Sequence, residues 1–189
     1  METENKIIKL LIENKRSLTI REVSKEIKSD YKIVHTAVLR LVNKGILNQR
    51  RIGKAIQVSL SNNFTKEIFQ AEFERRTEIL KNKNLSVMFE TIKKEVDSVN
   101  FILLLFGSYS KKTENKKSDI DLIFILPNLE NEKRIEQIIS ILPLKIHSLI
   151  FTERQFKEMK DSRELNVVKE AIKNNIILYG IEQYYELIK

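Results

Sequence analysis

Two aspartates that flank a single apolar residue are the side chains of this sequence best suited to chemistry. Asp119 and Asp121 stand on either side of Ile120, and Asp119 follows Ser108 by eleven residues. Because side chains alternate along a strand, both carboxylates should lie on one face and Ile120 on the opposite, buried face. Two carboxylates this close repel each other, so the pattern favours a divalent cation such as Mg²⁺ between them.

A Gly-Ser pair precedes the aspartates and predicts an anion site. The apolar run Phe101–Phe106 ends at Gly107 and Ser108. The missing Cβ of glycine lets a ligand approach the backbone closely. If a short helix opens there, its free N–H groups and the Ser108 hydroxyl form a site suited to phosphate groups. Phosphates beside paired carboxylates are the usual setting for Mg²⁺ bound to a nucleotide.

The hydrophobic pattern around these residues predicts a small mixed α/β domain. Strands are expected at 100–106, 119–126, 143–151 and 176–178, and helices at 130–141, 156–174 and 181–188. The preceding segment, 64–99, is expected to be helical in two pieces that break near 82–84. Its apolar stripe is expected to belong to the core and consists of Phe64, Ile68, Phe69 and Phe73.

The positive charge of the chain is concentrated in its first third. The formal charge is +8; residues 1–62 hold 13 Lys and Arg against 6 Asp and Glu, a net +7, and residues 63–189 hold +1. A basic segment followed by a near-neutral one indicates two domains with different partners.

Three short helices and a hairpin are predicted in the basic segment. The first helix is expected at 5–14, and Thr19 can cap the second. Ser29 and Asp30 offer an N-cap for the third, at 31–44. Alternation then predicts a hairpin whose turn holds Gly53 and three basic side chains.

The order of these elements over residues 5–60 resembles the winged helix-turn-helix family. The resemblance implies double-stranded DNA as a partner, with the third helix in the major groove and the hairpin on the backbone. The DNA-contacting residues that it implies are Lys32, His35, Thr36, Arg40, Arg50, Arg51 and Lys54. A winged helix that binds protein is the alternative, and the charge of +7 on this segment favours nucleic acid.

Composition excludes several other classes of protein. The 189 residues are 42% hydrophobic and 32% charged, which suits a folded chain with a buried core. The absence of cysteine excludes disulfides and thiolate metal sites and leads us to expect a reducing, cytoplasmic location. No membrane partner is expected, because Phe101–Phe106 is the longest apolar run and a bilayer span needs ~20 residues. The acidic, polar start does not resemble a signal peptide.

The Gly-Ser and Asp-x-Asp pattern resembles the nucleotidyltransferase superfamily related to DNA polymerase β, particularly its minimal members. The final segment 167–185 is similar to the closing segment of small prokaryotic members that carry an N-terminal winged helix. The resemblance implies that Gly107 and Ser108 bind the phosphates of a nucleoside triphosphate (NTP) and that Asp119 and Asp121 bind Mg²⁺ or Mn²⁺. Nearby lysines could neutralise the triphosphate or form a solvated loop; they are Lys111, Lys112, Lys116 and Lys117.

The sequence departs from this family at one catalytic position. Members usually supply a third carboxylate from the next core strand, but residues 144–150 contain no acid. The nearest acid is Glu153, beyond the end of that strand, and His147 takes the position or one close to it. A neutral imidazole could act there as a general base or a metal ligand, or His147 could be a bystander.

The expected fold class is therefore α+β, an N-terminal winged helix-turn-helix followed by a small mixed α/β nucleotidyltransferase domain. The expected division is a DNA-binding domain at 1–62, a helical linker at 63–84 and the second domain at 85–189. The expected function is metal-dependent transfer of a nucleoside monophosphate to a hydroxyl, with catalytic residues Asp119, Asp121 and His147. The alternative is a DNA-binding regulator or antitoxin whose second domain binds nucleotide with little or no activity. A protein acceptor, a toxin partner and a homodimer stay open.

Overall fold

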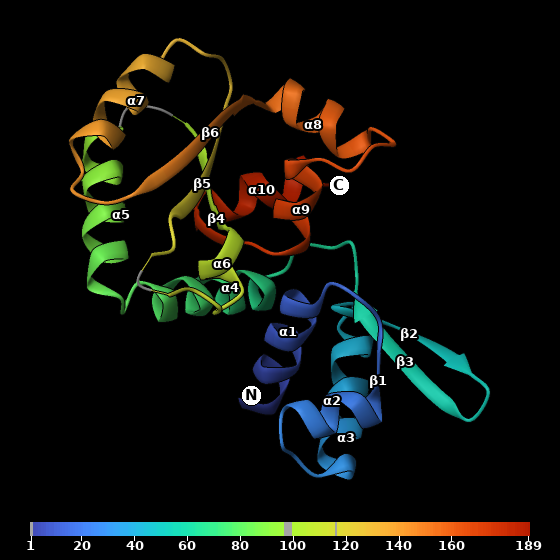
Figure 1. The fold of residues 1–189 in the computed structure, drawn as a ribbon. Helices are drawn as coiled ribbons and strands as arrows, with labels where there is room; N and C mark the ends of the chain where they lie inside the picture. The colour runs from blue at the N-terminus through green and yellow to red at the C-terminus, as the bar shows by residue number, and fades with distance from the viewer. Residues whose placement is uncertain (1, 97–99, 116) are drawn as a thin grey trace. The chain divides into compact units, whose positions relative to one another are not determined.

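The computed structural model describes residues 2–96, 100–115 and 117–189. The chain divides into two compact units, Met1–Glu74 and Arg75–Lys189 (Figure 1). The division falls inside helix α4 (Lys66–Ile79), within the segment predicted as a linker. Lys116 and the predicted helix end at 97–99 lie outside the described residues. None of the described helices is long and apolar enough to cross a membrane.

The first unit is a winged helix-turn-helix, as predicted. Its elements are α1 (Glu2–Asn14), β1 (Leu18–Thr19), α2 (Ile20–Glu26), α3 (Tyr31–Asn43), β2 (Leu47–Ile52) and β3 (Ala55–Leu60). The three strands form an antiparallel sheet in the order β1-β3-β2. Strand β1 was not predicted, because its two residues are too few to show an alternating pattern.

Local capping explains where α2 and α3 begin. Thr19 caps α2, and the Glu22 backbone N–H donates to its hydroxyl at 3.2 Å. The Thr19 backbone N–H donates to the Glu22 carboxylate at 2.6 Å, and this hydrogen bond lowers the pKa of Glu22. Asp30 caps α3, since its carboxylate accepts from the Lys32 N–H at 2.8 Å. Both predicted caps are confirmed.

The hairpin turn is shorter than predicted. Strands β2 and β3 stay paired up to Ile52 and Ala55, so that only Gly53 and Lys54 form the turn. Gly53 has a φ of +58°, which permits a two-residue turn. The prediction that Arg50 and Arg51 lie in the turn is therefore wrong; both are on β2.

The second unit is built on a four-stranded mixed sheet in the order β6-β5-β4-β7. Its strands are β4 (Ile102–Phe106), β5 (Ile120–Leu126), β6 (Ile146–Thr152) and β7 (Ile176–Tyr179). Strand β4 is antiparallel to β5 and β7, and β5 is parallel to β6. Figure 1 shows α5 (Lys83–Glu95) and α7 (Glu132–Ile141) on one side of the sheet. On the other side lie α8 (Glu153–Asp161), α9 (Val167–Lys173) and α10 (Ile181–Leu187).

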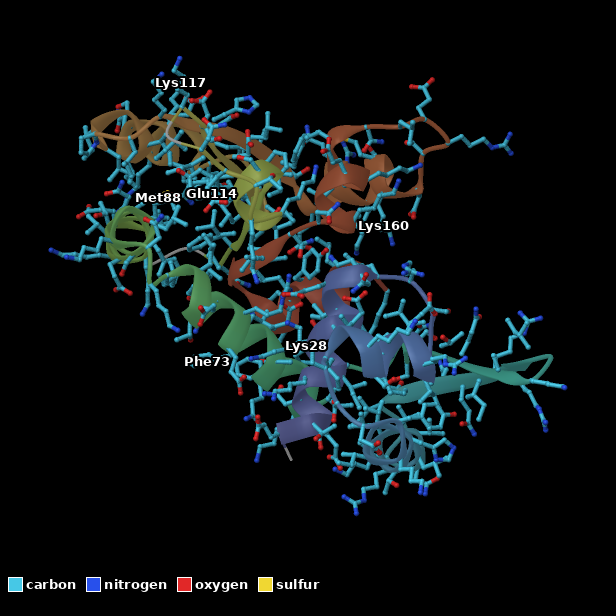
Figure 2. The ribbon with its side chains drawn as sticks, turned by 60° about the horizontal axis from the view of Figure 1, so that its bottom comes forward. Lys28, Phe73, Met88, Glu114, Lys117 and Lys160 are labelled. Atoms are coloured by element: carbon cyan, nitrogen blue, oxygen red, sulfur yellow. The ribbon has the colours of Figure 1, made fainter. Side chains whose placement is uncertain are left out.

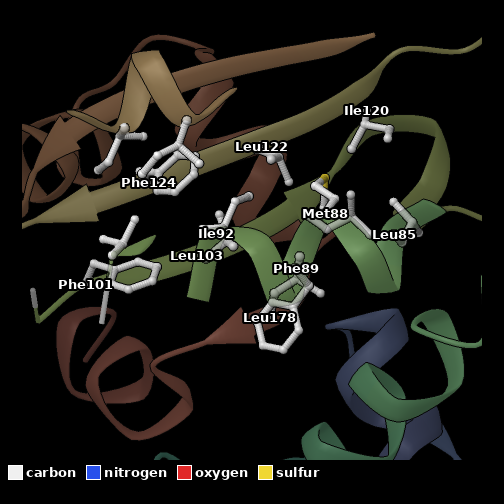
Figure 3. Packing of buried hydrophobic residues seen from close by; sticks show 14 of the residues in the cluster. Leu85, Met88, Phe89, Ile92, Phe101, Leu103, Ile120, Leu122, Phe124 and Leu178 are labelled. Carbon is white, nitrogen blue, oxygen red and sulfur yellow. The ribbon is translucent and has the colours of Figure 1, made fainter. Parts of the chain in front are cut away.

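Side chains alternate along β5, so that Ile120 and Asp121 lie on opposite faces of the sheet. Ile120, Leu122 and Phe124 all belong to the cluster that packs against α5. Figure 3 shows them close to Met88 and Ile92 of that helix. Asp121 therefore projects from the other face of the sheet, as the alternation predicted.

The predicted helix at 156–174 is wrong, because the structure has two helices, α8 and α9, in its place. Asn166 separates them. Its side-chain N–H donates to the Met159 carbonyl of α8 at 2.8 Å, and its side-chain oxygen accepts from the Lys169 N–H of α9 at 3.0 Å. A single asparagine thus satisfies a backbone group of each helix. The predicted break near 82–84 is confirmed, since Asn82 caps α5.

The prediction that the apolar stripe Phe64, Ile68, Phe69 and Phe73 belongs to the core is wrong for two of its members. Phe69 is 38% exposed and Phe73 is 44% exposed, and their rings stack with centroids 6.4 Å apart. Figure 2 shows Phe73 on the outside of this helix. The buried apolar positions are Ile68 and Ala71, which lie on a different side of the helix from this pair.

Candidate active site

The turn between β4 and α6 (Gly107–Ser110) is in contact with the Asp121 carboxylate. Phe106, the last residue of β4, pairs with Asp121 of β5, which brings the following residue against that side chain. Gly107 has a φ of +69°, and a Cβ added to it would lie 2.1 Å from Asp121 Oδ2. Only glycine avoids both the backbone strain and this clash. A short helix does begin directly after β4, which is the condition on which the predicted anion site depended.

Hydrogen bonds hold the turn against the segment before β7. The Ser110 hydroxyl lies 3.0 Å from the Gly107 carbonyl and 3.2 Å from the Asn174 carbonyl, both of which can accept its proton. Ser108, which lies between Gly107 and Ser110 in the chain, is half-buried. The end of α6 is thus tied both to the Gly107 carbonyl and to the segment before β7.

The two aspartates stand at the start of β5. Asp119 directly precedes the strand and is exposed, and the side chain of Asp121 is 27% exposed. Ile120, between them, is buried, and its N–H donates to the Lys145 carbonyl at 2.9 Å, just before β6. The carboxylate oxygens of Asp119 and Asp121 thus lie at the end of the sheet that adjoins the Gly107 turn.

His147 lies beside Asp121. The parallel pairing of β5 and β6 places these two residues opposite each other, so their side chains share one face of the sheet. His147 Nδ1 is 3.3 Å from Asp121 Oδ1, and the His147 side chain is 61% exposed. The structure thus puts an imidazole where the resemblance led us to expect a third carboxylate.

Glu153 is too far along β6 to supply that carboxylate. The pairing runs from Asp121 opposite His147 to Leu126 opposite Thr152, and Glu153 begins the next helix. The five residue steps from His147 to Thr152 span roughly 17 Å at ~3.3 Å each. Across residues 2–96, 100–115 and 117–189, no group of three or more His, Asp or Glu side chains is placed to hold a metal.

The lysines of the following loop differ in their surroundings. Lys111 Nζ is 3.0 Å from Glu170 Oε1 of α9, so a carboxylate already offsets its charge. Lys112 and Lys117 are exposed, as is Glu114 between them, and Figure 2 labels Glu114 and Lys117. The sequence did not indicate the pairing of Lys111, because Glu170 is far away along the chain.

Comparison with known protein families identifies this unit. The family model described as "Polymerase beta, Nucleotidyltransferase" matches residues 88–184. The chain belongs to this family. The matched region contains Gly107, Ser108, Asp119, Asp121 and His147.

Two further comparisons add little to the nucleotidyltransferase assignment. A solved structure, reduced HlyU from Vibrio cholerae N16961, is 19% identical over 41% of this chain and 77% of that chain, with a TM-score of 0.35. A TM-score this low supports no argument about fold or function. Comparison with curated proteins finds no match.

Outside the nucleotidyltransferase domain, the residues predicted to contact DNA lie on the surface of the winged helix. On α3, Lys32, Thr36 and Arg40 are exposed and His35 is half-buried. On the wing, Arg50, Arg51 and Lys54 are exposed. The expected DNA contact of Arg40 has a competitor, because the Glu4 carboxylate is 3.9 Å from Arg40 Nη1. The same carboxylate is 3.1 Å from Lys44 Nζ.

Sequence reasoning missed two cations of α2. Arg21 and Lys25 line a surface concavity of about 560 Å³ together with Lys54 of the wing, and its lining residues include no Asp or Glu. The signal was present in the sequence, because residues four apart lie on the same face of a helix.

A double-mutant cycle tests the contact between the Gly107 turn and Asp121. We expect Gly107→Ala to lower the free energy of unfolding more in the natural chain than in an Asp121→Ala background. In that background only the left-handed backbone is penalised, by about 1–2 kcal/mol. In the natural chain the overlap with Oδ2 adds about 1 kcal/mol or more. Urea unfolding of the four proteins measures both costs, and losses that add within about 0.5 kcal/mol would contradict the contact.

Proposed function

We propose that the chain is a metal-dependent nucleotidyltransferase that moves a nucleoside monophosphate from an NTP to a hydroxyl group. The observation that carries the proposal is the contact between the Gly107 turn and Asp121, where an added Cβ would lie 2.1 Å from the carboxylate oxygen. A phosphate-binding turn and a metal-binding carboxylate must adjoin each other for this reaction. The family match over 88–184 supports the same reaction class.

Gly107 and Ser108 are proposed to bind the β- and γ-phosphates. The missing Cβ of Gly107, at a φ of +69°, makes room for the Asp121 carboxylate, and the backbone N–H groups of the turn are the proposed donors to the phosphate oxygens. The hydroxyl of Ser108 adds a donor. Lys112 and Lys117 are exposed in the loop that follows and are proposed to offset the remaining charge of the triphosphate, with Lys111 held to Glu170.

The carboxylates suit a divalent cation. Oxygen ligands from Asp119 and Asp121, completed by phosphate oxygens and water, match the preference of Mg²⁺ and Mn²⁺ for few protein ligands beside a nucleotide. When bound, such an ion would polarise the α-phosphate and stabilise the departing pyrophosphate. Two carboxylates without a third are enough to hold an ion that the triphosphate also ligates.

The proposed reaction forms one bond and breaks one. The acceptor oxygen bonds to the α-phosphorus, the bond from that phosphorus to the bridging oxygen breaks, and pyrophosphate leaves. The acceptor proton passes to a base or to water. His147 is exposed and beside Asp121, so the proposal gives it a role in catalysis, as a base or as a ligand.

We further propose that the winged helix binds double-stranded DNA. Exposed cations lie on α3 and on the wing, among other places, and residues 1–62 carry a net +7. Arg40 is already close to Glu4, so Lys32 and Thr36 are the better candidates for contacts from α3. Arg21 and Lys25 would extend the phosphate-contacting surface across α2.

The lack of a third carboxylate supports a second candidate function. A DNA-binding regulator or antitoxin could use the same turn to bind a nucleotide with weak or no transfer. A partner protein, such as a toxin, would then be either the acceptor of the transferred group or a bound target. Transfer assays with labelled nucleotide separate these functions.

The transferase proposal predicts that Asp121→Asn removes activity. With labelled ATP, Mg²⁺ or Mn²⁺ and candidate acceptors, we expect transfer to fall by at least about 100-fold, because electrostatic stabilisation of the reacting phosphate is lost. Asp161→Asn, at the exposed end of α8, is the matched control and should transfer normally. The proposal fails if the natural chain transfers nothing and Asp121→Asn binds NTP as well as the natural chain does.

The DNA proposal predicts that removing two arginines of the wing lowers the affinity for duplex DNA and its dependence on salt concentration. Arg50→Ala combined with Arg51→Ala should weaken duplex binding and reduce the slope of log affinity against log salt concentration by about 2, since each phosphate contact contributes about 0.9. The charge-matched control is Arg154→Ala combined with Arg163→Ala, two exposed cations of the other unit. An unchanged affinity and slope in the wing variant would show that the wing does not contact DNA.

A further inference from the structure

The distance between the His147 imidazole and the Asp121 carboxylate bears on whether the two side chains could bind one ion. At 3.3 Å, Nδ1 and Oδ1 are farther apart than the 2.7–2.9 Å that is usual for a hydrogen bond between an imidazolium and a carboxylate. Two ligands at right angles, each about 2.1–2.2 Å from one ion, are about 3.0 Å apart. The observed separation is that of a long hydrogen bond, and with a slightly wider angle it is also compatible with two ligands of a common ion.

Both side chains can be reached from solvent. Asp121 is 27% exposed and His147 is 61% exposed, and a pair this exposed contributes little to stability. The register fixes the backbones of the pair, since β5 and β6 hold the two residues opposite each other. An ion would therefore meet ligands from two strands that are already in position.

Glu153 does not take the place of the imidazole. Glu153 follows the far end of β6, and no three His, Asp or Glu side chains of the described segments form a metal-binding group. An ion between this pair would take an oxygen from Asp121 and a nitrogen from His147, beside the oxygen that the proposed function assigns to Asp119. Mg²⁺ prefers an all-oxygen set, whereas first-row transition ions accept imidazole readily.

We infer that His147 is a metal ligand together with Asp121, and that the site selects a divalent transition-metal ion such as Mn²⁺ over Mg²⁺. This inference rests on the proposed function, because the triphosphate supplies the other oxygen ligands. It assigns the imidazole to the metal and leaves the acceptor proton to water. If His147 were instead a general base, the ion would have no nitrogen ligand.

Pulsed electron paramagnetic resonance of Mn²⁺ tests the inference. The probe is Mn²⁺ with inorganic tripolyphosphate, which contains no nitrogen, added to the full chain. We expect the echo modulation of an imidazole ¹⁴N nucleus in the natural chain and its loss in His147→Gln. The chain has two histidines, so His35→Gln identifies the source of the nitrogen and should leave the modulation unchanged. Unfolding curves of His147→Gln that match those of the natural chain show that the variant folds.

Competition between Mg²⁺ and Mn²⁺ gives a second measurement. In the natural chain, the Mg²⁺ concentration that displaces half of the bound Mn²⁺ should exceed that in His147→Asp by about tenfold or more, because the variant replaces the nitrogen ligand with an oxygen ligand that suits Mg²⁺. Equal concentrations in the two proteins would overturn the claimed selectivity.

The outcomes separate this inference from the proposed function. Mn²⁺ that binds with tripolyphosphate, depends on Asp121 and shows no ¹⁴N modulation would overturn the role of His147 and leave the transferase proposal intact. Mn²⁺ and Mg²⁺ that bind no more tightly to the natural chain than to Asp121→Asn would overturn both.

Discussion

The contact between a left-handed glycine and a carboxylate is the constraint on which the site depends. Gly107 turns the chain at the end of β4 with a φ of +69°, and its missing Cβ leaves room for Asp121 Oδ2. The pairing of Phe106 with Asp121 forces the two together. The turn proposed to bind phosphate and the carboxylate proposed to bind the metal therefore form a single site.

The strand order then decides which residue completes this site. Because β6 lies beside β5 in parallel, the residue opposite Asp121 is near the start of β6, and that residue is His147. An acid that follows the far end of β6, such as Glu153, is too far away to contact Asp121. The departure from the expected pattern is thus an imidazole in place of a carboxylate at one position beside Asp121.

Much of this architecture could be predicted from local patterns. The caps at Thr19, Asp30 and Asn82 depend on residues within one turn of helix, and the buried face of β5 follows from alternation, so these predictions were confirmed. The break between α8 and α9 depends on hydrogen bonds from Asn166 to both helices, which helical periodicity does not show.

Long-range effects explain the other errors and omissions. The exposure of Phe69 and Phe73 depends on which side of α4 is covered, and the pairing of Lys111 with Glu170 joins residues far apart in sequence. The closeness of His147 to Asp121 needed the strand order as well as the strands. Residue types thus suggested a chemistry for the site, and the register determined the distances.

The most direct test of the central claim is a crystal structure of the full chain with Mn²⁺ and an NTP analogue whose α–β bridge cannot be cleaved. The account predicts that the triphosphate lies on the backbone of Gly107 and Ser108 and that the ion joins a phosphate oxygen to Asp121. A nucleotide bound elsewhere, or an ion that does not contact Asp121, would contradict it.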